Sequence, residues 1–146
     1  MGTVRAIPEG YGTVTPFLNI KGADAAIELY KQAFGAEEGR RFMMPDGKVA
    51  LVELKIGTSI LRVSESVDVP PSASSFGIYT EDANAAWARA TAAGCEVVLP
   101  LEDRFFGDRF GILKDPYGNR WAIAQHVRDV SDEEMRSLAP EARRIR

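Results

Sequence analysis

The chain has 146 residues, of which 45% are hydrophobic and 27% charged, a balance that excludes wholesale disorder. The formal net charge of −3 argues against a nucleic-acid or anionic-lipid partner, and no apolar run is long enough for a membrane-spanning helix. The single cysteine, Cys95, excludes an internal disulfide, and the single histidine, His126, excludes sites that need two histidines from one chain. We expect a cytoplasmic protein without nucleic-acid or membrane partners.

The first half of the chain predicts one helix among four strands. A strand is expected at 14–20, a helix at 23–34, and further strands at 40–43, 49–56 and 60–64. Apolar residues at helical spacing define the helix, and Gly35 provides its C-terminal cap. Asp46 and Gly47 lie between apolar stretches and predict a hairpin turn.

The second half predicts the same order of elements. A strand is expected at 76–80, a helix at 83–93 between Asp82 and Gly94, and strands at 96–99, 109–114 and 120–126. The two helix-ending glycines lie 94 − 35 = 59 positions apart. The sequence therefore predicts an α+β protein of two tandem βαβββ modules.

A module of this size cannot bury its own sheet face, so the two sheets are expected to curl and enclose a cleft. We expect an N-terminal arm at 1–13, modules at 14–66 and 76–127, a linker at 67–75 and a C-terminal helical tail at 128–146, with 14–127 forming one structural domain. In the tail, the capping box that starts at Ser131 predicts a helix to about Leu138, which Pro140 ends.

Several segments carry a family resemblance. They are the stretches VTPFLNI at 14–20, AAIELYKQAFGA at 25–36, MPDG at 44–47, ELKIG at 53–57, FGDRFGILKDPYGNRWAIA at 106–124 and HVRDVS at 126–131. With them the chain resembles the vicinal oxygen chelate superfamily of glyoxalases, ring-cleaving dioxygenases and bleomycin-resistance proteins, and within it the PhnB-like branch. The resemblance implies the glyoxalase/bleomycin-resistance-like fold and a homodimer.

The metal enzymes of this superfamily hold their ion with side chains from four strands. The resemblance places those ligand positions on Thr15, Glu53, Ser75 or its neighbour, and Ala122. Only Glu53 is a typical ligand, and one carboxylate does not hold a divalent transition metal firmly. We therefore predict no metal site and no cofactor.

Strand alternation predicts which side chains face the cleft. The aromatic residues around the loop at 105–110 are expected to line its rim, and small residues at three of the ligand positions leave volume for a flat, hydrophobic ligand. The predicted ligand-binding residues are Thr15, Phe17, Asn19, Leu51, Glu53, Ile60, Arg62, Ser64, Ser75, Tyr79, Phe105, Phe106, Phe110 and Ala122.

Three specific functions remain open on these residues, beside a fourth, a housekeeping protein with an unknown ligand. The missing ligands favour a metal-free protein that sequesters a hydrophobic aromatic natural product or drug, as resistance members of the superfamily do. The alternatives are a metal-dependent lyase, isomerase or dioxygenase, and a metal-free enzyme with Glu53 as its general base. Glu53 is also a candidate for pairing with Lys55, Arg62 or Arg120, and the cleft is compatible with one chain or with a swapped dimer.

Overall fold

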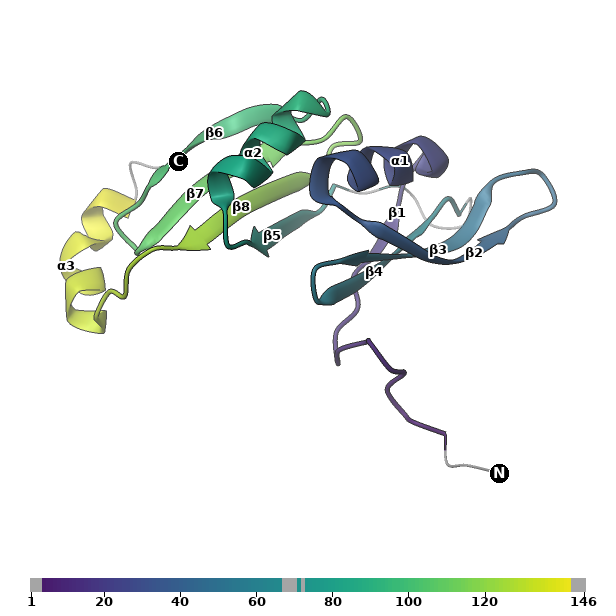
Figure 1. Ribbon diagram of the computed structural model, residues 1–146, viewed down its shortest axis with the longest axis horizontal. Coiled ribbons are helices and arrows are strands. Elements are labelled where there is room, and N and C mark those ends of the chain that lie inside the picture. The colour runs from purple at the N-terminus through teal and green to yellow at the C-terminus, as the bar shows by residue number, and fades with distance from the viewer. Residues whose placement is uncertain (1–3, 67–70, 72, 143–146) are drawn as a thin grey trace. The chain divides into compact units, whose positions relative to one another are not determined.

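The computed structural model describes residues 4–66, 71 and 73–142, and the chain divides into two compact units, Met1–Ser74 and Ser75–Arg146 (Figure 1). In unit 1, β1 (Phe17–Asn19) is followed by α1 (Ala23–Phe34), β2 (Glu37–Met43), β3 (Val49–Ile56) and β4 (Ser59–Ser64). The sheet order is β1-β4-β3-β2, with β1 parallel to β4 and the other pairs antiparallel.

Unit 2 has the same arrangement. Its elements are β5 (Ser75–Tyr79), α2 (Ala83–Ala92), β6 (Glu96–Asp103), β7 (Asp108–Lys114), β8 (Arg120–His126) and a further helix, α3 (Asp132–Ala142). The sheet order β5-β8-β7-β6 matches that of unit 1 position by position, again with one parallel pair. The predicted α+β class and the doubled βαβββ module are therefore confirmed.

Some boundaries differ from those expected. The first strand is shorter than 14–20, β6 continues four residues beyond Leu99, and Ser75 opens β5. The helix α3 continues to Ala142, past Pro140, because the φ angle that proline fixes is compatible with helical backbone even though its missing N–H removes one hydrogen bond. Residues 67–70 and 72 of the expected linker, 1–3 of the arm and 143–146 of the tail lie outside the described residues.

The core of unit 1 lies between α1 and one face of its sheet. From the helix, Ile27 and Tyr30 are fully buried, and from the sheet Val52, Leu54 and Val63 are fully buried as well. Figure 1 shows α1 lying along that face. The alternate strand residues therefore point to the other side, here called the unit 1 helix-free face.

The core of unit 2 is built around Trp121, which is 1% exposed. Its indole Nε1 donates to Oδ2 of the buried Asp115 at 2.9 Å, and the other oxygen of that carboxylate accepts the backbone N–H groups of Tyr117 and Asn119. This one buried carboxylate thus holds both the turn before β8 and the core tryptophan in place, because a buried charge needs such partners.

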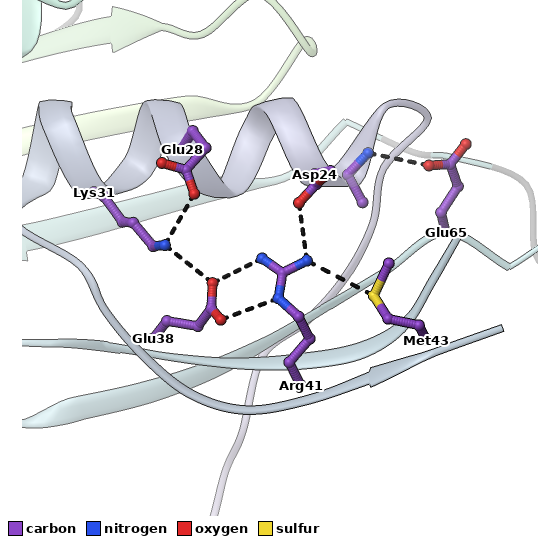
Figure 2. Close-up of polar contacts among 8 residues, drawn as sticks. Asp24, Glu28, Lys31, Glu38, Arg41, Met43 and Glu65 are labelled. Carbon is purple, nitrogen blue, oxygen red and sulfur yellow. Dashed lines mark hydrogen bonds and ion pairs between the residues drawn. The ribbon is translucent and has the colours of Figure 1, made fainter. Parts of the chain in front are cut away.

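A network of charged side chains joins α1 to β2 (Figure 2). Arg41 donates to Glu38 at 2.7 and 3.0 Å and to Asp24 at 2.8 Å, and Lys31 contacts both Glu28 and Glu38.

The N-terminal cap position of α1 is occupied by Gly22, which makes no side-chain cap hydrogen bond. The carboxylate of Glu65 accepts the free N–H of Ala23 instead. Within the described residues, no helix is long and apolar enough to span a membrane.

Candidate functional site

Three predicted site residues form one row across the unit 1 helix-free face. Phe17 on β1 is the register partner of Arg62 on β4, which is the register partner of Glu53 on β3. The Phe17 residue is 70% exposed, whereas Leu18 beside it is buried on the helix side. The guanidinium carbon of Arg62 lies 5.4 Å from the centroid of the Phe17 ring, within the range of a cation–π contact.

Tyr11, which is not among the residues predicted from strand alternation, joins this row from the N-terminal arm. Its hydroxyl donates to Glu53 Oε2 and accepts a hydrogen bond of 3.3 Å from Arg62 Nε. The Arg62 guanidinium carbon is also 5.2 Å from the Tyr11 ring centroid. Tyr11 lies in an irregular segment, so no strand or helix periodicity could have assigned it to the face.

Glu53 is largely surrounded by polar partners. Its side chain is 17% exposed, accepts the Tyr11 hydroxyl hydrogen, and lies 3.7 Å from Nε of the exposed Arg40. Gly39 on β2 lies beside it, where a Cβ would be 3.4 Å from that of Glu53. The Glu53 carboxylate therefore has a structural role as a hydrogen-bond acceptor. It must lose the hydrogen bond from Tyr11 before it can act as a proton acceptor.

The other predicted residues of unit 1 have different surroundings. Leu51, Ile60, Ser64 and Thr15 are half-buried. Asn19 is tied to the chain just after β4, since its side chain accepts from the Ser66 N–H at 2.7 Å and donates to the Ser66 carbonyl at 3.2 Å. This pair of bonds holds the ends of two neighbouring strands together.

In unit 2, the face opposite α2 combines small and aromatic side chains. Ala122 is flanked by Gly77 and Ile112, and Ala124 by Tyr79 and Phe110. Phe106 packs edge-to-face against both Phe105 and Phe110, with ring centroids 5.3 and 5.4 Å apart. The structure thus brings together the three phenylalanines that were predicted to line the rim of the cleft. Phe110 is the one that lies beside Ala124, as its register partner. Ser75 lies at the start of β5, exposed, opposite Arg120.

A hydrogen-bonded chain at the end of this sheet was not foreseen. The buried Asp108 accepts the Tyr79 hydroxyl at 2.7 Å and contacts His126 Nδ1 at 2.8 Å, while His126 Nε2 contacts the exposed Asp129 at 2.7 Å. These carboxylates, Asp129 foremost, raise the pKa of His126, and the bond to Asp108 raises the pKa of Tyr79. Asp108 and His126 are register partners, which strand alignment could have indicated.

An open pocket of about 450 Å³ adjoins these hydrogen-bonded side chains. It is lined by Tyr79, Thr80, Glu81, Gln125 and His126. Gln125 is engaged through its side-chain oxygen, which accepts the N–H of Ala83 at the start of α2. Cys95 lies apart from both faces in the core, and burial raises the pKa of its thiol to about 11. A thiol with that pKa is a poor nucleophile at neutral pH.

The residues at the superfamily's metal-ligand positions do not fit a metal ion. Thr15 and Ser75 offer hydroxyls, Ala122 offers a methyl group, and the carboxylate of Glu53 is engaged by Tyr11. In the part of the chain that the structure describes, no group of three or more His, Cys, Asp and Glu side chains is close enough to hold a metal.

Comparisons with known proteins agree with this architecture. An uncharacterized protein of Mycobacterium tuberculosis is 33% identical, over 85% of this chain and 80% of its own. The crystal structure of an Arabidopsis thaliana gene product is 28% identical with a TM-score of 0.64, covering 78% of this chain and 98% of that one.

TnmS3, an antibiotic binding protein from Streptomyces sp. CB03234, shares the fold at 19% identity, with a TM-score of 0.62, over 79% of this chain and 97% of its own. The family model for the Glyoxalase/Bleomycin resistance protein/Dioxygenase superfamily matches residues 12–123, most of both modules. The chain belongs to the glyoxalase/bleomycin resistance protein/dioxygenase superfamily.

Proposed function

We propose that this protein binds a hydrophobic aromatic small molecule, without a metal, and sequesters it as a resistance protein does. The observation that carries the proposal is the exposed Phe17 ring beside Arg62 on the unit 1 helix-free face. An aromatic ring that is 70% exposed gains burial and stacking when a flat ligand covers it. The antibiotic-binding description of TnmS3, a protein of the same fold, supports binding of a small molecule.

The enzyme alternatives gain less from the geometry. A general base at Glu53 must first lose the hydrogen bond from Tyr11, and a metal centre needs ligands that three of the four positions lack. The homodimer and the cytoplasmic location expected from the sequence stay predictions, as does a cleft enclosed by the two sheets.

The test is a thermal-shift panel of aromatic antibiotics and of divalent metals on chelator-treated protein. An aromatic ligand at about a hundred times its Kd should add about 2.7 kcal/mol to the free energy of unfolding, and metals should add nothing. We expect Phe17→Ala to weaken binding of the stabilising compound by about tenfold, because stacking and burial are lost.

The control is Val127→Ala, which also removes an exposed apolar side chain but lies just after β8, outside both sheets. Equal affinities of the two variants would place the ligand away from Phe17. Stabilisation by metals and by none of the aromatic compounds would overturn the proposal.

A further inference from the structure

The pairing of charges on the unit 1 helix-free face is unusual. Glu53 and Arg62 are direct register partners on the antiparallel strands β3 and β4. Opposite charges at such positions ordinarily attract each other across the strands. Here the Tyr11 hydroxyl bridges them instead, donating to the Glu53 carboxylate and accepting from Arg62 Nε.

This bridge leaves most of the Arg62 guanidinium available. A guanidinium has five N–H donors, and in this structure only the Nε–H has an acceptor among the described residues. The four donors on the two Nη atoms belong to a half-buried side chain on a face that carries the exposed ring of Phe17. A guanidinium edge with free, parallel donors matches two oxygens of one anionic group.

The arm that supplies Tyr11 is fitted to this face. Tyr11 N–H donates to the Pro8 carbonyl at 3.1 Å, which closes a turn through Gly10. Gly10 has a φ of 86°, and a Cβ at this glycine would lie 3.3 Å from Cδ1 of Ile60 on β4. The turn thus passes close to β4, two residues before Arg62 on the same strand, and glycine permits both the backbone conformation and the approach.

We propose that Tyr11 keeps Arg62 free to bind an acidic or strongly accepting oxygen group on the aromatic ligand, such as a carboxylate, sulfonate or phenolate. This inference rests on the proposed function and adds the chemical class of the ligand. Phe17 receives the ring system, Arg62 receives the oxygen group, and Tyr11 is a positioning residue that satisfies Glu53 without consuming the guanidinium.

The experiment uses two fluorescent probes that share one ring system. 8-Anilinonaphthalene-1-sulfonate carries the anionic group, and N-phenyl-1-naphthylamine lacks it. We expect the folded wild-type protein to bind the sulfonate about tenfold more tightly, since a hydrogen bond to a charged group is worth that much at a partly exposed site. Arg62→Gln should remove this preference and leave the affinity for the neutral probe unchanged.

Tyr11→Phe provides the second test. It keeps the ring and removes the hydroxyl, so Glu53 becomes free to pair directly with Arg62. The sulfonate should then bind more weakly, while the neutral probe again binds as before. The matched control is Lys48→Gln, which removes one exposed positive charge from the turn between β2 and β3 and should leave both affinities unaltered.

The outcomes separate the two proposals. Binding of the neutral probe with no preference for the sulfonate, or a preference that survives Arg62→Gln, would overturn this inference and leave the aromatic site standing. Failure of both probes to bind the wild-type protein would count against the aromatic site and this inference together. Circular dichroism of each variant checks that the fold is retained.

Discussion

At the scale of single residues, strand alternation predicted that Phe17, Arg62 and Glu53 share one face, because β1, β3 and β4 are regular where these residues lie, but their register as one row comes from the structure. It could not predict Tyr11, whose position depends on a turn in an irregular arm. It also gives no information on hydrogen bonds, such as those that join the Asn19 side chain to Ser66. The sheet face on which a strand residue lies can thus be predicted from the sequence, whereas its hydrogen-bond partners on that face cannot.

Gly111 shows how one residue sets the packing of unit 2. A Cβ at this position on β7 would lie 2.6 Å from the ring of Trp87 on α2 and 2.9 Å from Leu101 Cα on β6. Such distances force the helix or the neighbouring strand to shift. We expect Gly111→Ala to lower the free energy of unfolding by about 1–3 kcal/mol, as overpacking does, measured by urea denaturation.

Gly77→Ala is the matched control, because a Cβ on this β5 glycine meets nothing within 4 Å. It should leave the stability unchanged or raise it slightly, since alanine restricts the unfolded chain more than glycine does. If the two variants were equally stable, the close contact between Trp87 and β7 would not exist in solution.

At the scale of elements, the bounds of α1 could be predicted because three independent signals coincide there. Apolar residues recur at helical spacing, Gly35 ends the helix in the left-handed conformation with φ of 67°, and the chain continues as a strand. The strand β6 was predicted too short for an equally physical reason. Its register shifts between Val97 and Leu99 and again between Leu99 and Glu102, so its alternation is interrupted.

The link between α1 and β2 gives a prediction at this scale. Hydrogen bonds from Arg41, with a further one from Lys31, lower the pKa of Glu38 from 4.5 to about 2. A carboxylate whose pKa is lower in the folded state stabilises the fold above its unfolded pKa and loses that effect as the pH falls. Glu38→Gln should therefore cost about 1–2 kcal/mol at neutral pH, after allowance for solvent screening of a side chain that is 24% exposed.

The difference between wild type and Glu38→Gln should shrink as the pH falls from about 4.5 to about 2, the window that the two pKa values define. Denaturation at a series of pH values measures it. Glu37→Gln, at the adjacent exposed position of β2, is the control and should show a much smaller cost. A cost for Glu38→Gln that stayed constant down to pH 2 would mean that the charge of Glu38 contributes nothing.

At the scale of the whole molecule, the repeated order of predicted elements, with Gly35 and Gly94 at an offset of 59 residues, predicted the doubled module, and the structure shows the same strand order in both units. The offset could not predict the specialisation of the two faces. The unit 1 face carries an arginine, a glutamate and an arm-derived tyrosine, whereas the unit 2 face carries alanines beside a group of phenylalanines. The two modules therefore share one backbone arrangement, while the side chains on their equivalent faces differ.

The sequence also predicts that 14–127 behaves as one structural domain, because a single module buries too little of its sheet. Both tryptophans of the chain, Trp87 and Trp121, lie in unit 2, so tryptophan fluorescence reports on unit 2 alone, while circular dichroism reports on the strands and helices of both units. We expect urea transitions followed by the two methods to coincide, as they do when a chain unfolds in one cooperative step. Gly111→Ala should then shift both curves together. Separate midpoints, with only the fluorescence curve moved by the substitution, would show instead that unit 1 folds independently of unit 2.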